Sequence, residues 1–188
     1  MRFHRSTLSV AACVAFLVIE GEAAAQPLAL LVELSAQRLD ISRRVALVKW
    51  DSNAPVADPP GDPREGQVIA AAVEEATQRG LSAELAAGFF ADQIEASKLK
   101  QFSLMANWRR TGSAPAEARA DLKGELRPAL DRLGVSLVEA LVATEPLRQD
   151  PACRLEVAKA TEIYVTTHQR DALDAVALDR GLARACGN

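Results

Sequence analysis

Two long segments of the chain carry apolar residues at the three- and four-residue spacing of one helix face, and polar side chains interrupt both stripes. In the first, Arg38 takes a stripe position, and Lys49, 11 residues later, lies about 20° away on the same face. In the second, Ser97 and Gln101 take stripe positions. The apolar members are Leu31, Leu34, Ile41, Val45 and Val48, and then Phe90, Ile94, Met105 and Trp108. Because buried cations need partners, this pattern predicts a pocket for a small anion.

Composition favours one helical domain. The 188 residues are 49% hydrophobic, which is enough for one core, and only 4% are aromatic. No segment alternates apolar and polar residues as a strand does, so the expected fold class is all-α, with about six helices. The basic pairs at 43–44 and 109–110 are isolated and the net charge is −3, so we expect no nucleic-acid partner.

The helix ends are marked by capping residues. The expected helices run roughly over residues 28–51, 62–80, 82–112, 126–141, 150–168 and from 171 onward. Asp62 can cap the second helix, Pro63 suits its first position, and Glu65 could complete a capping box. Ser82 can cap the third helix, and Gly112 follows its end.

The N-terminus is typical of a secretory signal peptide, residues 1–25. A basic start precedes an apolar run from Leu8 to Ile19 that is too short to span a bilayer, and three alanines precede Gln26. The protein is then periplasmic or secreted and free of the membrane, with residues 26–188 forming one all-helical domain. A lipoprotein processed at Cys13 is the alternative.

Removal of the signal leaves two cysteines, Cys153 and Cys186. An even pair in an exported chain favours a disulfide over a metal site or a catalytic thiol. A thiolate nucleophile would need a neighbouring histidine, for which only His168 is available, and too few ligands remain for a metal, so none is expected. A bridge across 33 residues would stabilise the fold by about 3–4 kcal/mol.

The order and spacing of the polar residues resemble a known family. Arg38 is followed by Lys49, then Pro55, the pair Arg64-Glu65, and Ser97-xxx-Gln101. This pattern resembles the AroQ-class chorismate mutases. The export signal, the segment at 126–131 and the C-terminal cysteine pair resemble the secreted, or gamma, subclass, and the resemblance extends from Leu30 to Cys186.

The resemblance implies an all-helical isomerase that converts chorismate to prephenate by a Claisen rearrangement within one molecule. It also implies a homodimer and no cofactor. The substrate is a dicarboxylate, which needs cations to hold it. Negative charge grows on the ether oxygen in the transition state, where hydrogen-bond donors would stabilise it. Holding chorismate in the compact conformer that can react would supply the rest of the rate acceleration.

The resemblance also assigns roles to seven residues. The catalytic set is Lys49 and Gln101, as donors to the ether oxygen, together with Arg38. The carboxylates would be held by Arg38, Arg64 and Arg127, with help from Ser97, and Glu65 would accept from the ring hydroxyl. The family often has an acid three residues before the helix-two arginine, where this chain has Gly61, with Asp58 and Asp62 nearby. Glu65 would therefore carry more of that contact.

Each residue also has a structural explanation. Arg38 and Lys49 could extend their charged ends to solvent, Ser97 could bond to its own helix, and Arg127 could be solvated. The alternative function is a non-catalytic exported helical binding or chaperone-like protein, whose cations would be spread over exposed faces. A pyruvate-releasing lyase on the same fold is the enzymatic alternative.

Overall fold

The computed structural model describes residues 19–59 and 62–187. Residues 1–18 of the expected signal peptide, and Gly61, lie outside the described residues. The described residues form helices and no strand, which confirms the all-α fold class. The helices are α1 (Ile19–Asp51), α2 (Arg64–Gln78), α3 (Ala83–Thr111), α4 (Arg127–Ala143), α5 (Glu145–Arg148), α6 (Cys153–Thr167) and α7 (Ala172–Gly181), with a π-helical turn, η1 (Leu122–Leu126), before α4.

Six of these helices, α1, α2, α3, α4, α6 and α7, correspond to the six expected ones, and η1 and α5 were not predicted. The turn η1 and the single turn of α5 are each too short to show a helical period in the sequence. The first helix also begins at Ile19 rather than near Leu28, and it continues through Pro27 and the predicted cleavage site. The three alanines before Gln26 are strong helix formers, which accounts for the longer helix.

The predicted caps are found at α2 and α3, but the predicted capping box at α2 is not. Ser82 Oγ accepts from the backbone N of Leu85 at 3.1 Å, and α3 ends at Gly112, whose φ of 85° suits glycine. Asp171 caps α7. At α2, Asp62 Oδ1 accepts from the backbone N of Arg64 at 2.8 Å, and Pro63 between them has helical backbone angles. Glu65 forms no capping box, and its carboxylate pairs with Lys98 instead.

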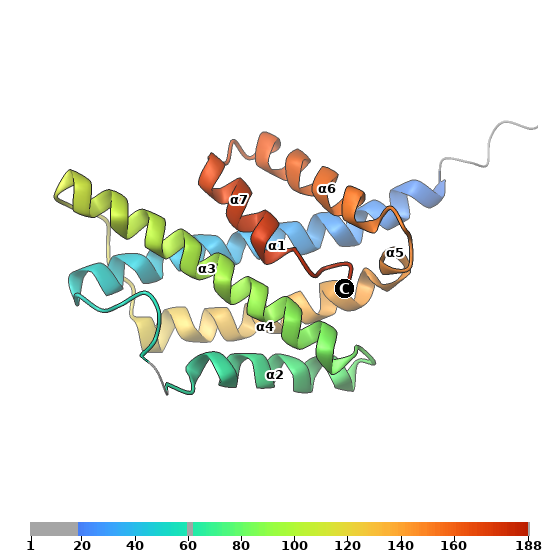
Figure 1. The fold of residues 1–188 in the computed structure, drawn as a ribbon, viewed down its shortest axis with the longest axis horizontal. Coiled ribbons are helices and arrows are strands. Elements are labelled where there is room, and N and C mark those ends of the chain that lie inside the picture. Colours follow the sequence, from blue (N-terminus) through green and yellow to red (C-terminus); the bar gives the residue numbers. More distant parts are fainter. Residues whose placement is uncertain (1–18, 60–61, 188) are drawn as a thin grey trace, which may run out of the picture.

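The helices pack in two groups on either side of α3 (Figure 1). α2 and α4 lie on one side, and α6 and α7 lie on the other, while α1 runs behind and contacts α3, α4, α6 and α7. The main core contains fully buried Leu31, Phe89, Phe90, Leu137 and Leu141. Within the described residues, no helix is long and apolar enough to cross a membrane.

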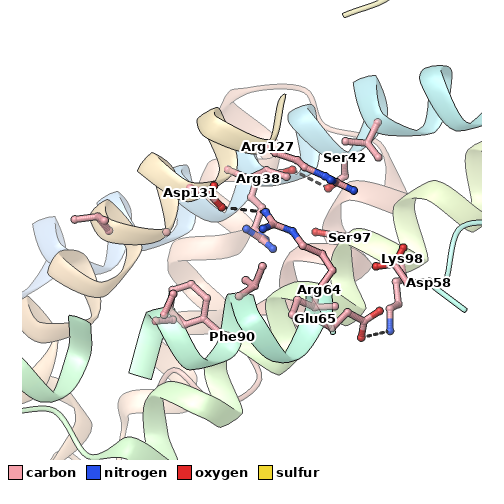
Figure 2. A pocket seen from close by; sticks show the side chains of 18 of the residues that line it. Arg38, Ser42, Asp58, Arg64, Glu65, Phe90, Ser97, Lys98, Arg127 and Asp131 are labelled. Atoms are coloured by element: carbon pink, nitrogen blue, oxygen red, sulfur yellow. Dashed lines mark hydrogen bonds and ion pairs between the residues drawn. The ribbon is translucent and has the colours of Figure 1, made fainter. Parts of the chain in front are cut away.

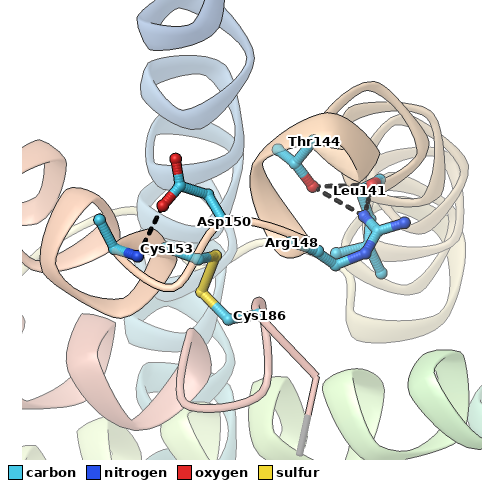
Figure 3. The surroundings of a disulfide bond; sticks show 7 residues. Leu141, Thr144, Arg148, Asp150, Cys153 and Cys186 are labelled. Atoms are coloured by element: carbon cyan, nitrogen blue, oxygen red, sulfur yellow. Dashed lines mark hydrogen bonds between the residues drawn. A yellow bond between two sulfur atoms is a disulfide. The ribbon is translucent and has the colours of Figure 1, made fainter.

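A disulfide joins Cys153 to Cys186, as the sequence predicts, with the two Cα atoms 5.9 Å apart (Figure 3). Cys153 begins α6 and Cys186 follows α7, so the bridge fastens the end of the chain to the start of the α6–α7 hairpin. Both cysteines pack in the main core, which also contains Leu137 and Leu141 of α4.

Candidate active site

All seven predicted site residues line one cavity between α1, α2, α3 and α4. Its volume is about 520 Å³, and its walls include Arg38, Lys49, Arg64, Glu65, Ser97, Gln101 and Arg127. Arg38 and Lys49 come from α1, Arg64 and Glu65 from the first turn of α2, and Ser97 and Gln101 from the middle of α3. The structure therefore brings together residues that are up to 89 positions apart, from Arg38 to Arg127.

Arg38 is a buried cation at the base of the cavity. Its exposed fraction is only 6%, and its Nε has no hydrogen-bond partner among the described residues. The pKa of Arg38 is lowered to about 10, mainly by burial and also by the nearby Arg64, while Asp131 opposes the change. The side chain thus does not extend to solvent, and its unpaired donor is available to an anion.

Two further guanidinium groups approach the same space (Figure 2). Arg64 Nη2 lies 3.1 Å from Asp131 Oδ1 of α4, in a pair that is open to solvent. Arg127 is the first residue of α4 and is half-buried against the cavity. The turn η1 ends immediately before Arg127. Asp121 Oδ1 caps this turn by accepting from the backbone N of Lys123 at 2.9 Å.

Lys49 lies where α1 ends and the loop after it turns back. Its Nζ donates to the carbonyl oxygen of Val56 at 2.7 Å and lies 3.8 Å from Asp58 Oδ1. Burial lowers the pKa of Lys49 below its ordinary value, and Asp58 partly opposes this while Arg127 adds to it. The carbonyl and the carboxylate fix the ammonium against the cavity wall.

The two polar residues of α3 differ in their contacts. Gln101 is 7% exposed, and its Oε1 is buried without a hydrogen-bond partner among the described residues. Ser97 Oγ donates to the carbonyl oxygen of Gln93 at 2.9 Å, which is the local bond expected of a lone helical serine. Both side chains still face the cavity.

Residues 29–102 match the family described as chorismate mutase type II. A secreted chorismate mutase from Mycolicibacterium smegmatis is 30% identical over 162 residues, which cover 86% of this chain and 87% of that protein. The chain belongs to the chorismate mutase family. The crystal structure of chorismate mutase from Burkholderia phymatum is 42% identical with a TM-score of 0.83, over 88% of this chain and 99% of that one.

A more distant chorismate mutase shares the fold. The secreted enzyme from Yersinia pestis is 21% identical with a TM-score of 0.64, over 82% of this chain and 94% of that one. Secretion of the named relatives agrees with the periplasmic or secreted location that the N-terminus predicts.

The cavity of this chorismate mutase also contains charged residues that the sequence reasoning did not assign. Asp58 lines it, whereas Asp62 does not, so Asp58 is the loop acid nearest to the site. Lys98 Nζ lies 2.8 Å from Glu65 Oε2 and 2.9 Å from Glu95 Oε1. Lys98 is next to Ser97 and outside the apolar stripe, so the helical spacing gave no reason to select it. Among the described residues no group of His, Cys, Asp and Glu could hold a metal ion.

Proposed function

We propose that the chain, as an exported chorismate mutase, converts chorismate to prephenate in this cavity, with Lys49 and Gln101 donating hydrogen bonds to the ether oxygen. The observation that carries the proposal is the convergence of four cations, Arg38, Lys49, Arg64 and Arg127, on one cavity. A dicarboxylate supplies two negative charges for these cations, including the unpaired donor of buried Arg38.

The role of Lys49 follows from where charge grows in the rearrangement. The ether bond breaks ahead of carbon–carbon bond formation, and the ether oxygen gains negative charge. An ammonium already held by the Val56 carbonyl needs little reorganisation to stabilise that charge, so it favours the transition state over the bound substrate. Gln101 would add a second, neutral donor from the opposite wall. No proton transfer is needed.

The remaining residues would position the substrate. Arg38, Arg64 and Arg127 would hold the two carboxylates, and Ser97 would assist by turning its hydroxyl from the Gln93 carbonyl. Glu65 would accept from the ring hydroxyl while Lys98 holds its carboxylate in place.

The convergence argues against the non-catalytic alternative, because a helical binding or chaperone-like protein has no need to bury Arg38 beside Arg64. A lyase on this fold would release pyruvate instead of making prephenate. The deciding experiment therefore follows the loss of chorismate by absorbance with purified protein and identifies the product. Prephenate dehydrates in acid to phenylpyruvate, and free pyruvate would instead indicate the lyase.

Substitution tests the site itself. Lys49→Ala and Arg38→Ala should each lower kcat/KM at least 100-fold with the helical fold intact, because a donor to a developing charge in a dry site contributes about 3–4 kcal/mol. Lys159→Ala is a matched control, since that lysine is exposed on α6 and outside the cavity. Rates like those of the wild type in both site variants would exclude the proposed site.

Two further proposals concern processing and assembly. The mature domain would begin at Gln26 and comprise residues 26–188, which N-terminal sequencing of the exported protein would test.

The chain would pair as a homodimer in which each subunit has a complete site, because Arg127 lines the same cavity as the other ligands. The exposed apolar side chains Ile163 and Val176 are consistent with a partner surface. Light scattering would measure the molecular mass of the protein in solution and so distinguish a dimer from a monomer.

A further inference from the structure

The cavity continues beyond the residues assigned to chorismate. On α2 the proposed substrate ligands are Arg64 and Glu65, both in the first turn, yet α2 lines the cavity as far as Gln78. The apolar part of this wall runs from Val68 to Ala72, which is about 6 Å along a helix axis. We call this continuation the apolar arm and define it by Val68, Ala71, Ala72, Phe90, Val135 and Val138.

Small residues leave room in the arm. Ala71 and Ala72 form its α2 wall, and Gly134 lies opposite on α4. A Cβ atom at Gly134 would meet only Phe90 Cε1, at 3.8 Å, so the space beside the glycine is open. Beyond these residues α2 lines the cavity with Glu74, Glu75 and Gln78, of which Glu75 forms an ion pair with Arg79 at 2.5 Å. The arm therefore offers an apolar lining to a ligand.

The inner end of the arm is cationic. In Figure 2 the guanidinium groups of Arg38 and Arg64 lie between Phe90 on one side and Glu65 with Lys98 on the other. Arg38 is more than nine-tenths buried and its Nε has no hydrogen-bond partner among the described residues. An anionic head placed on these arginines could thus extend its body either toward Glu65 or into the arm.

We propose that the arm binds apolar monocarboxylates, with the carboxylate on Arg38 and Arg64 and the hydrocarbon tail between α2 and α4. One end of such a molecule matches the paired guanidinium groups, and the other matches the alanine, valine and phenylalanine lining. Because the head uses cations that the proposed function assigns to chorismate, the two ligands exclude one another. The competition between the two ligands rests on the proposed function, whereas binding of the monocarboxylate by itself does not.

Direct binding of straight-chain acids tests the proposal without any reaction. Calorimetry of the full chain with acetate, butanoate, hexanoate, octanoate and decanoate, below micelle-forming concentrations, should show affinity rising about three- to fourfold per added methylene. The rise should end once the arm is filled. In the mutase assay octanoate should raise KM for chorismate and leave kcat unchanged. Affinity that is independent of chain length would overturn the proposal.

Two variants on neighbouring positions of α2 localise the binding. Ala71→Phe fills the arm and should weaken octanoate binding at least tenfold, leave acetate binding unchanged and keep kcat/KM for chorismate within twofold. Ala70→Phe is the matched control, because Ala70 is exposed on the same helix and does not line the cavity. Equal effects of the two variants on octanoate, or none from Ala71→Phe, would refute the arm as the site.

The experiment separates the two proposals. If Lys49→Ala retained full turnover, the proposed function would fail while the calorimetric series still measured binding in the arm. If a second subunit covers Val135 and closes the arm, the purified dimer will bind octanoate no better than acetate, and this inference fails while the mutase activity remains.

Discussion

At the scale of single residues, the site is recognised by polar atoms that the protein itself leaves without partners. Arg38 Nε and Gln101 Oε1 are both buried and unpartnered among the described residues. Folded proteins pair nearly all such atoms, because each unpaired one costs about 1–3 kcal/mol. Both residues line the cavity, whereas Asp92 Oδ2, which is also unpartnered, does not. A ligand carboxylate can accept from Arg38 Nε, while the amide nitrogen of Gln101, not Oε1, is the proposed donor to the ether oxygen.

Gln101→Glu should make turnover increase as the pH falls. An amide donates at any pH, whereas a carboxyl group donates to an ether oxygen only when protonated. Burial raises the pKa of such a carboxyl, so the neutral form becomes available in mildly acidic buffer. A pH series of kcat/KM for wild type and variant measures this. Identical profiles would show that the side chain does not contact the reacting ether.

Arg38→Met should stabilise the fold while it abolishes most activity. The folded pKa of Arg38 is lowered to about 10, so the charged form is penalised at every pH below that value, including pH 7, and the penalty fades only as the pH rises through 10. Methionine keeps the apolar stem without the buried charge, and we expect Tm at pH 7 to rise about 2–4 °C per kcal/mol recovered. A lower Tm would mean that Arg38 stabilises the fold.

At the scale of helices, short α7 depends on its contacts with α3. It spans Ala172–Gly181, fewer residues than an isolated helix needs to be stable in water. Lys100 of α3 forms a buried ion pair with Asp174 of α7, and Arg170 Nη1 lies 3.6 Å from Asp174 Oδ2. The pair fastens α7 to α3 through a lysine that does not line the cavity.

Lys100→Met should destabilise the protein by about 3 kcal/mol, because it leaves the buried Asp174 carboxylate with only the more distant Arg170. The double variant Lys100→Met with Asp174→Leu should recover most of that loss, since neither charge then remains buried. Lys159→Met, at an exposed pair on α6, should cost under about 1 kcal/mol. Urea unfolding measures all three. If the double variant were less stable than the single one, the pair itself would be stabilising.

At the scale of the whole molecule, the candidate cavity and the disulfide are formed by different residues. The cavity is enclosed by α1, α2, α3 and α4, while the Cys153–Cys186 bridge fastens the α6–α7 hairpin (Figures 1 and 3). Neither cysteine lines the cavity. The bridge should therefore act on stability alone.

The double variant Cys153→Ser with Cys186→Ser should lower Tm and leave kcat/KM at 25 °C nearly unchanged. The bridge closes a segment of 33 residues, which corresponds to about 3–4 kcal/mol of unfolded-state entropy. Thermal melts and initial rates on the oxidised, reduced and substituted protein measure the two effects. Activity lost on gentle reduction without unfolding would contradict a purely structural bridge.

Local patterns in the sequence predicted most of the helices and the residues that line the candidate cavity. Helical periodicity and capping residues such as Ser82 and Asp171 depend only on near neighbours in the chain, so they can be read before the fold is known. Helical spacing likewise placed the polar residues Arg38 and Gln101 on the buried faces of their helices.

The partners of the site residues depended on how the helices pack. The ion-pair partner of Glu65 depends on which face of α3 lies against α2. That partner is Lys98, which lies outside the apolar stripe of α3. The Val56 carbonyl on Lys49 and the apolar arm likewise arise between segments that are far apart in sequence or separated by a loop. Such contacts have no period, because they follow from the crossing of whole helices rather than from the spacing of residues along one of them.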